Sequence, residues 1–508
     1  MTKRFYLTTA IAYPNGKPHM GHAYEAIATD AIARFKRLDG FNVRLLTGTD
    51  EHGLKIAQAA KAAGVPPRNY VDGTSQPFMD LDRQLGISFD RFIRTTDTDH
   101  RALCEALWQR MAANGDLYLG RYEGWYSVRD EAYYDETELV TGEDASGASV
   151  KLSPQGTPVE WTVEESWFFK LSAYADRLLA HYADQPGFIQ PISRFNEMRS
   201  FVAGGLSDLS ISRTSFDWGI PVPGSPGHVM YVWVDALANY LTGAGGLDGE
   251  WWPADLHIIG KDVVRFHAIY WPAFLMSAGI PLPKTVFGHG FVLNRGVKMS
   301  KSDGNVVDPA AMADRFGVDR LRWFLLRDVA FGDDGSYSDE AIIERTNADL
   351  ANGIGNLAQR ALSMVAKNLG GVMPAPLPHD GVAALVDSIQ SLTAAYFAAM
   401  NGLQLHRALE AVMGMVSAAN GFFAEAAPWK LAKTDETAMA GVLAVTLDAT
   451  RRIVLLVQPF MPGSSAALLD QLGVAADARD FSAFNNTVAA GSQLPAPQGV
   501  FPRWAEPA

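Results

Sequence analysis

The sequence predicts an α/β domain with a parallel, doubly wound sheet, interrupted by an insertion and followed by an all-α segment. In residues 1–117, short apolar runs alternate with helical periods, which is typical of a parallel sheet covered by helices. Residues 118–215 are richer in aromatic and turn residues and less periodic, which indicates an insertion. From about Asp339 onward long helical periods dominate and predict a helical bundle.

Turn residues mark the elements of the first half of the sheet. Residues 5–12 form an apolar run that predicts a strand, and the helical period over residues 19–38 ends at Asp39-Gly40. Residues 42–47 predict a second strand, and residues 51–64 predict a helix that ends at a glycine before two prolines. Ligands of such sheets bind where loops leave the carboxyl ends of the strands, so we expect the functional site at that edge.

The alternation of strands and helices resumes after the insertion. Residues 229–234 and 256–260 predict strands, residues 262–277 predict a helix, and residues 285–293 predict a further strand. Four long helical periods follow, over residues 341–368, 381–401, 403–426 and 438–459.

Composition limits the classes of protein to which the chain can belong. Its 508 residues are enough for two to four domains. The formal charge of −13 argues against non-specific binding of nucleic acid, although it is compatible with a local basic track. Cys104 is the only cysteine, which excludes an internal disulfide and a zinc site of several cysteines, and fits a reducing compartment. We expect Cys104 to be a core residue of a helix.

No segment predicts secretion or a membrane span. The first apolar run is cut short at Tyr13-Pro14-Asn15-Gly16, and no small-residue cleavage site follows it. The late apolar stretch of residues 442–461 contains Asp448, Arg451 and Arg452, which are costly in a bilayer. We therefore expect a cytoplasmic protein.

Two short motifs, far apart in the chain, indicate one nucleotide site. His19-Met20-Gly21-His22 opens the first helix, and its two imidazoles share a face at a helix start, where phosphate binds readily. Lys298-Met299-Ser300-Lys301-Ser302 lies between Gly296 and Gly304, and its two ammonium groups suit a clamp on phosphate oxygens. Either motif alone could be accidental, but their order and separation predict that both contact one triphosphate.

Each of these residues also has a simpler interpretation. His19 or His22 alone could cap or pack the helix, and the two lysines could form a solvated basic turn. Gly21 strengthens the functional interpretation, because glycine in a helix costs about 1 kcal/mol and would let a flat group such as a purine approach. Lysines that engage as charge develops on a departing pyrophosphate would stabilise the transition state selectively.

These motifs resemble those of the class I aminoacyl-tRNA synthetases, and within that class the methionyl-tRNA synthetase family. The class hallmarks are written HIGH and KMSKS; the first appears here as His19-Met20-Gly21-His22 and the second is intact. The resemblance extends over roughly residues 4–470. Further matching segments are Tyr13-Pro14-Asn15-Gly16, Thr47-Gly48-Thr49-Asp50-Glu51-His52-Gly53, Tyr231-Val232-Trp233-Val234-Asp235-Ala236, Gly260-Lys261-Asp262, Phe266-His267, Asn356-Leu357-Ala358-Gln359-Arg360 and Ala427-Pro428-Trp429.

The resemblance implies a Rossmann-type α/β catalytic domain with a connective insertion, followed by an all-α helical bundle that binds the anticodon. The implied boundaries are residues 1–117 and 216–293 for the two halves of the catalytic domain, 118–215 for the insertion, 294–340 for the KMSKS loop and stem-contact segment, and 341–508 for the anticodon-binding domain. The implied substrates are L-methionine, ATP with Mg²⁺, and methionine tRNA.

The resemblance also implies roles for individual residues. The charged groups that act on the ATP phosphates would be His19, His22, Lys298 and Lys301. The remaining ATP-binding residues would be Gly21, Asp262, His289, Gly290, Val292, Ser300 and Ser302. The methionine site would be lined by Ile11, Tyr13, Asp50, Trp233, Ala236, Leu237, Tyr240 and His267. The anticodon would be bound by Asn356, Arg360 and Trp429.

The chemistry of these residue types agrees with a methionine site. Aromatic walls such as Trp233 and Tyr13 give a thioether sulfur–ring contacts of about 0.3–1.5 kcal/mol each. A hydrogen from the Tyr240 hydroxyl or the His267 imidazole can be donated weakly to sulfur, and Asp50 would pair with the substrate ammonium. Taken without the resemblance, Trp233 and Tyr240 would be ordinary core residues.

The chain departs from many relatives in its insertion. A zinc site built on four cysteines is common there, whereas residues 142–156 contain no cysteine, so we expect the form without structural zinc. No extra tRNA-binding module follows the helical segment, so a monomer is expected. Two alternatives stay open: a class I synthetase for another apolar amino acid, and a tRNA-binding relative without catalytic activity.

Overall fold

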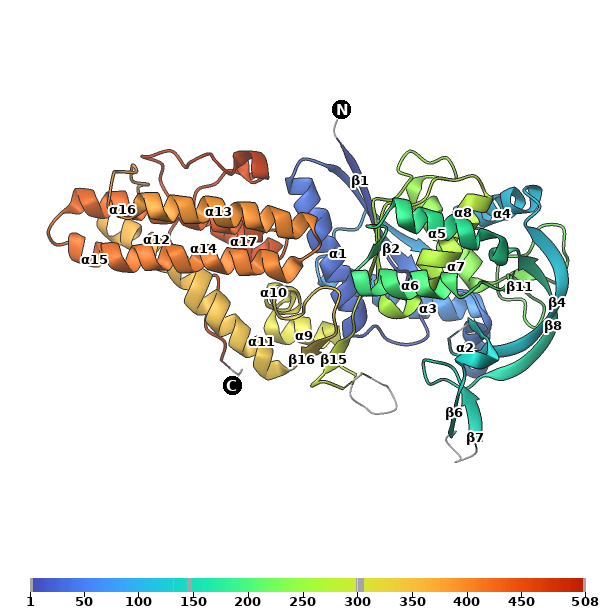
Figure 1. The fold of residues 1–508 in the computed structure, drawn as a ribbon. Helices are drawn as coiled ribbons and strands as arrows, with labels where there is room; N and C mark the ends of the chain where they lie inside the picture. The colour runs from blue at the N-terminus through green and yellow to red at the C-terminus, as the bar shows by residue number, and fades with distance from the viewer. Residues whose placement is uncertain (1–2, 131, 144–148, 298, 300–305, 506–508) are drawn as a thin grey trace.

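The protein has a sheet domain and a helical bundle, with the first helix at their junction (Figure 1). A computed structural model describes residues 3–130, 132–143, 149–297, 299 and 306–505. The predicted residues Lys298, Ser300, Lys301 and Ser302 therefore lie outside the described residues.

The sheet domain is built on six parallel strands in the spatial order β3, β2, β1, β13, β14 and β9. The strands span Arg4–Thr9 (β1), Asn42–Thr49 (β2), Arg91–Arg94 (β3), Ile189–Gln190 (β9), Leu256–Gly260 (β13) and Val286–His289 (β14). The strand order reverses between β1 and β13, where Leu7 pairs with Leu256 and Thr9 with Ile258. This reversal is the topological switch point at which doubly wound sheets bind ligands, so the sequence-based expectation of a parallel sheet is confirmed.

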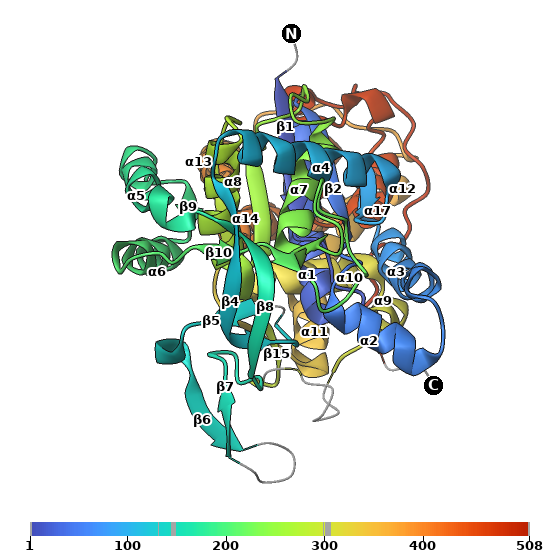
Figure 2. The same ribbon diagram turned by 90° about the vertical axis from the view of Figure 1, so that its right-hand side faces the viewer.

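Helices cover both faces of the sheet because alternate strand residues point to opposite sides. Leu7 and Ile258 belong to the same core as helix α1, whereas Tyr6 and Ile259 belong to the core of α7 and α8. The helices of this domain are α1 (Met20–Leu38), α2 (Leu54–Ala63), α3 (Pro67–Gln84), α4 (Thr98–Ala113), α7 (Val232–Ala244) and α8 (Trp271–Ser277). Figure 1 shows α1 and α7 on opposite sides of strands β1 and β2, and Figure 2 shows the molecule from the side of α4.

The prediction of a strand over residues 229–234 was wrong for most of its length. Only Val229–Met230 forms a strand (β12), which pairs with β11 (Ser212–Arg213), and α7 begins at Val232. The three valines of this stretch favour a strand locally, but the residues that follow continue a buried helix, and tertiary packing decides the outcome.

The insertion forms a second, antiparallel sheet that extends away from the first. Its strand order is β10, β8, β4 and β5, and the long pair β4–β8 curves along one edge of the molecule (Figure 1). These strands span Leu117–Ser127 (β4), Ala132–Tyr134 (β5), Glu160–Phe169 (β8) and Leu209–Ser210 (β10). A hairpin of Val140–Glu143 (β6) and Ser149–Leu152 (β7), and helices Ala175–Asp184 (α5) and Ile192–Ala203 (α6), complete the insertion.

A short segment connects the sheet domain to the bundle. Strand β15 (Val292–Asn294) pairs in parallel with β16 (Gly335–Tyr337), and helices α9 (Pro309–Phe316) and α10 (Val318–Asp328) lie between them in sequence. The buried side chains of α10 belong to a core that continues from α1 into the bundle.

The bundle contains the long helices that the sequence predicts. The predicted periods correspond to α11 (Asp339–Arg345) with α12 (Asn356–Asn368), to α13 (Val382–Asn401), to α14 (Leu405–Ala426) and to α16 (Glu436–Val457). The bundle also contains two shorter helices that were not predicted, α15 (Pro428–Leu431) and α17 (Pro462–Gln471). A π-helical stretch, Thr346–Gly355, joins α11 to α12. By length and composition α13 would suffice to cross a bilayer, which is weak evidence because helices of soluble proteins pass the same test.

Candidate active site

A cavity of about 770 Å³ lies at the carboxyl edge of the sheet, where β1 adjoins β13. The loops that leave β1, β2, β13 and β14 line it. All eight residues expected at methionine line it: Ile11, Tyr13, Asp50, Trp233, Ala236, Leu237, Tyr240 and His267. So do the residues expected at ATP that are described: His19, Gly21, His22, Asp262, His289, Gly290 and Val292. Residues remote in sequence thus share one cavity.

His19 and His22 cap the start of α1 reciprocally. The backbone N–H of Gly21 donates to Nδ1 of His19 at 3.1 Å, and the backbone N–H of His19 donates to Nδ1 of His22 at 3.1 Å. The ring centres are 3.8 Å apart. Because each Nδ1 accepts, the neutral form of each ring carries its hydrogen on Nε2, which is suited to donate to an anion.

The structure gives a reason for glycine at position 21 that the sequence did not reveal. A Cβ atom at this position would lie 2.9 Å from Cε1 of His19. Any larger residue would therefore push the capping imidazole aside. The glycine allows the cap itself, whether or not a purine also approaches it.

Backbone pairing brings the ends of β1 and β2 together. The N–H of Asp50 donates to the carbonyl of Ala12 at 2.8 Å, and the N–H of Ala12 donates to the carbonyl of Gly48 at 2.8 Å. A Cβ atom at Gly48 would lie 2.0 Å from the carbonyl oxygen of Ile93, so only glycine fits there. This pairing places Asp50 beside the segment that carries Ile11 and Tyr13.

Stacked aromatic rings form one wall of the cavity. The rings of Trp233 and Phe266 are 3.8 Å apart and nearly parallel, at 4°. The imidazole of His267 meets Trp233 edge-on, with centroids 6.0 Å apart. Phe266 and His267 are the first two residues of a π-helical turn, Phe266–Tyr270, a feature frequent at functional sites.

Tyr240 and His267 have a fixed hydrogen-bond arrangement. The Tyr240 hydroxyl is 2.6 Å from Nε2 of His267, and Nδ1 of His267 is 3.0 Å from the carbonyl oxygen of Val263. Burial lowers the pKa of His267 to about 4, so the ring is neutral at pH 7 and has one N–H. That hydrogen lies on Nδ1 because a carbonyl only accepts, so the Tyr240 hydroxyl donates to Nε2. In this arrangement both hydrogens already have acceptors within the protein.

His289 and Glu25 form a buried pair at the end of β14. Nε2 of His289 is 2.8 Å from Oε2 of Glu25, and Oε1 of Glu25 accepts the backbone N–H of Ala10 at 2.8 Å. Burial alone would lower the pKa of His289, but the hydrogen bond and charge of Glu25 outweigh burial and raise it. A Cβ atom at Gly290 would lie 2.2 Å from the backbone of Asp333, which explains that glycine.

Two described residues near the KMSKS lysines in sequence reach the same cavity. Met299 and Val306 both line it, together with the histidines of α1.

Several lining residues were not assigned to the site from the sequence. They are Lys17, Glu25, Lys55, Phe78, Arg129, Asp130, Gln155 and Phe266. Glu25 was open to prediction, because it lies three residues after His22 on the same face of a helix. Arg129, Asp130 and Gln155 come from the insertion, and nothing in the sequence indicates that its turns reach the sheet.

Helix α15, which carries Trp429, lies at the end of the bundle away from the sheet domain (Figure 1). Trp429 is 40% exposed and follows Ala427, whose φ of 44° turns the chain between α14 and α15. The guanidinium carbon of Arg360 is 5.2 Å from the centre of the Trp429 ring. Asn356 is exposed one turn before Arg360 on α12. The structure therefore brings Arg360 and Trp429 together on one surface.

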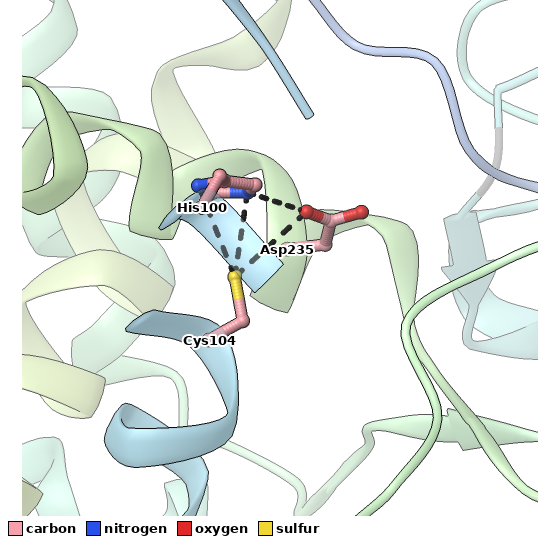
Figure 3. A group of neighbouring side chains, drawn as sticks. All are labelled: His100, Cys104 and Asp235. Atoms are coloured by element: carbon pink, nitrogen blue, oxygen red, sulfur yellow. Dashed lines mark hydrogen bonds and ion pairs between the residues drawn. The ribbon is translucent and has the colours of Figure 1, made fainter. Parts of the chain in front are cut away.

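Cys104 is buried, as predicted, but its neighbours are polar (Figure 3). Donor atoms of His100, Cys104 and Asp235 lie within 4.8 Å of one another, close enough to bind a metal ion. Burial and the nearby Asp235 carboxylate raise the pKa of the Cys104 thiol well above its usual value. A thiol that stays protonated is a poor metal ligand.

Two family models together match most of the chain. Residues 5–362 match tRNA synthetases class I (M), and residues 377–507 match the anticodon binding domain of methionyl tRNA ligase. Methionine–tRNA ligase of Mesorhizobium japonicum is 58% identical over 513 residues, covering 99% of this chain and 98% of that protein. The ligase of Mycobacterium bovis is 57% identical over 519 residues, covering 99% of each.

The solved structures agree. Mycobacterium tuberculosis methionyl-tRNA synthetase in complex with methionyl-adenylate is 56% identical and superimposes with a TM-score of 0.96, covering 99% of this chain and 100% of that one. The chain therefore belongs to the methionyl-tRNA synthetase family of the class I aminoacyl-tRNA synthetases.

Proposed function

We infer that this protein is a methionine–tRNA ligase that forms methionyl-adenylate from methionine and ATP and then transfers methionine to the 3′ end of its tRNA. One observation supports the location of this chemistry. The cavity at the switch point of the sheet gathers both the residues expected at methionine and the histidines expected at the ATP phosphates. The two substrates of the first step would therefore meet in one cavity.

In the first step, a carboxylate oxygen of methionine attacks the α-phosphorus of ATP. The new phosphorus–oxygen bond forms as the bond to the β-phosphate oxygen breaks, and pyrophosphate leaves. His19, His22, Lys298 and Lys301 stabilise the charge on the phosphates, and no side chain acts as a nucleophile. Such displacements depend mainly on positioning and on charge stabilisation, which these groups supply. Mg²⁺ enters with ATP and offsets phosphate charge.

The amino-acid end of the cavity holds methionine for this attack. Asp50 pairs with the substrate ammonium, and the side chain of the methionine substrate lies against Trp233 and the Tyr240–His267 pair. Asp262, His289 and the backbone at Gly290 hold the adenosine. These groups orient both reactants at the start of α1, where the phosphates are stabilised.

In the second step, a hydroxyl group of the terminal adenosine of tRNA attacks the methionyl carbonyl. An ester bond forms, the bond between the carbonyl carbon and the phosphate oxygen breaks, and AMP leaves. Trp429 stacks on an anticodon base while Arg360 and Asn356 contact base edges. We assign residues 341–508 to this recognition and residues 294–340 to the stem-contact segment, in a cytoplasmic monomer without structural zinc.

Exchange of labelled pyrophosphate into ATP, measured with each of the twenty amino acids, tests this function. We expect exchange with methionine and at least 100-fold less with leucine, isoleucine or valine, on the order of what a site with specific contacts achieves. The same preparation should charge methionine tRNA. Exchange with another apolar amino acid, or tRNA binding without exchange, would refute the assignment.

A further inference from the structure

Asp235 is a buried carboxylate that the reaction described above does not use. It lies in the first turn of α7 and its side chain is 1% exposed. Each of its oxygens has a histidine partner: Nδ1 of His52 is 2.5 Å from Oδ2, and Nε2 of His100 is 2.7 Å from Oδ1 (Figure 3 shows the His100 side). We call His52, Asp235 and His100 the carboxylate clasp.

The direction of the hydrogen bonds in the clasp follows from the charge of Asp235. Burial would raise the pKa of Asp235, but the charges and hydrogen bonds of the two histidines lower it to about 2. The carboxylate is therefore ionised and can only accept, so both imidazoles donate to it. The other nitrogen of His100, Nδ1, is 2.8 Å from the Thr242 hydroxyl. Both ring nitrogens of His100 therefore have a partner within the protein.

The clasp joins two walls of the methionine part of the cavity. His52 belongs to the loop after β2 and lies two residues beyond Asp50, which lines the cavity. Asp235 lies between Trp233 and Ala236, which line it from the other side. The outer partner, His100, is fully buried on α4. A single carboxylate thus connects the loop of Asp50, the helix of Trp233 and α4.

The backbone of the His52 loop is fixed on its other side as well. The indole N–H of Trp218 donates to the carbonyl of Glu51 at 2.7 Å, and the N–H of Gly53 donates to the carbonyl of Trp218 at 3.2 Å. The ring of His52 lies against Trp218, with centroids 5.2 Å apart. Movement of α7 relative to this loop would therefore have to break the bonds to Asp235.

From this arrangement we propose that the carboxylate clasp positions the methionine site, and that His52, Asp235 and His100 are positioning residues for methionine binding. The proposal rests on the proposed function. Loss of the His52 donor frees the loop of Asp50 from α7, and loss of the His100 donor frees α7 from α4. In either case the position of Trp233 relative to Asp50 is no longer fixed. Methionine affinity then falls, while the ATP end of the cavity, built on α1 and β14, is unaffected.

A metal centre at His100, Cys104 and Asp235 is the competing interpretation. Two ligands of a tetrahedral zinc ion, each about 2.0–2.1 Å from the metal, lie about 3.3 Å apart. The 2.7 Å between His100 and Asp235 is too short for that arrangement and fits a hydrogen bond. The sulfur of Cys104 is 3.9 Å from Oδ1 of Asp235, at the edge of contact.

Matched variants of His100 test the proposal in the full-length protein. His100→Leu removes the donor at similar size, whereas His100→Gln keeps an amide N–H directed at Asp235. Cys104→Ala is the control on the same helix. We measure KM for methionine and for ATP by pyrophosphate exchange, together with the melting temperature and the metal content of each protein.

We expect His100→Leu to raise KM for methionine by about ten-fold or more, since a 1 Å misplacement can cost about 100-fold. KM for ATP should stay within about two-fold, on the scale of a surface substitution. His100→Gln should recover most of the loss, and Cys104→Ala should leave both KM values unchanged. If His100→Leu does not fold, the same comparison is made at His52, which contacts the other carboxylate oxygen of Asp235. His52→Leu removes that donor and His52→Asn keeps an amide N–H.

Three results would overturn the proposal. In the first, the leucine variants lower the melting temperature but leave KM for methionine at the wild-type value. In the second, KM rises equally for methionine and ATP. In the third, the wild-type protein carries one equivalent of metal that Cys104→Ala loses together with methionine affinity. A wild-type protein inactive with methionine would refute the proposed function and this inference together, whereas the three results above leave that function standing.

Discussion

Arg322 is the buried cation at the junction of the sheet domain and the helical bundle, and replacing it with methionine should destabilise the protein strongly. Its side chain is fully buried. The guanidinium donates to Oδ2 of Asp30 at 2.7 Å and to the carbonyls of Leu85 at 3.3 Å, Pro459 at 3.0 Å and Phe460 at 2.9 Å. These partners belong to α1, to the end of α3 and to the residues just after α16.

The loss of stability in Arg322→Met follows from the buried groups that lose their partner. Arg322→Met removes one partner of a buried ion pair, which typically costs about 3–5 kcal/mol. It also leaves three buried carbonyls without this donor. Asp30 keeps Arg34, at 2.7 Å, and the N–H of Ser88, so its charge is not left alone. Arg322→Lys keeps the charge but not the planar set of donors, and we expect it to cost about 1–3 kcal/mol.

Thermal melting by circular dichroism measures this prediction. At about 2–4 °C per kcal/mol for a large domain, Arg322→Met should lower the melting temperature by about 6–20 °C. Arg4→Ala is the control, because the Arg4–Glu250 pair is exposed, with side chains 50% and 64% accessible. An exposed pair contributes less than about 1 kcal/mol. If both variants melted alike, the junction would not depend on Arg322.

Three further predictions concern the anticodon surface, the KMSKS loop and the methionine pocket. Trp429→Ala should raise KM for tRNA by about 5- to 150-fold, the equivalent of about 1–3 kcal/mol of stacking, and should spare pyrophosphate exchange. Lys430→Ala is the control. Equal loss of aminoacylation and of pyrophosphate exchange would contradict the assignment of Trp429 to the anticodon. Lys301→Ala should slow adenylate formation by about 2–4 kcal/mol in rapid-quench measurements with methionine affinity unchanged, and an unaltered rate would contradict a role on the phosphates. The pKa of His267 is about 4 in the folded protein and near 6.5 in the unfolded chain, so between these pH values the unfolded state binds more protons. As pH falls through this window, the free energy of unfolding therefore decreases by up to about 3 kcal/mol. Melting temperatures between pH 4.5 and 7 should therefore fall less steeply in His267→Gln than in the wild type, and equal slopes would refute this.

The parts of the fold that could be predicted are those with strong local signals. The strand at Arg4–Thr9 and helix Met20–Leu38 follow from an apolar run and a helical period separated by a turn. The start of α7 at Val232 could not be predicted, because valines favour strands locally and only burial on all sides selects the helix. A π-helical turn such as Phe266–Tyr270 is also invisible to periodicity, because it adds one residue to an otherwise regular pattern.

In the candidate site, too, the residues that could be predicted are those with strong local signals. His19, His22 and Trp233 were found through motifs that lie within single segments, and all line the cavity. Arg129 and Gln155 were missed because they reach the cavity only through the packing of the insertion. Hydrogen-bond direction was missed for a similar reason. That the Tyr240 hydroxyl donates to His267 depends on the burial that keeps the imidazole neutral, which the sequence does not show, as well as on the carbonyl of Val263 four residues earlier.

A crystal structure of this protein with a non-hydrolysable methionyl-adenylate analogue tests the central claim most directly. We predict that the thioether lies against Trp233 and Tyr240, and that the phosphate equivalent lies within hydrogen-bonding distance of His19 or His22. An analogue bound elsewhere would contradict the claim. Another cavity, about 650 Å³ between α13 and α16, would be such a place.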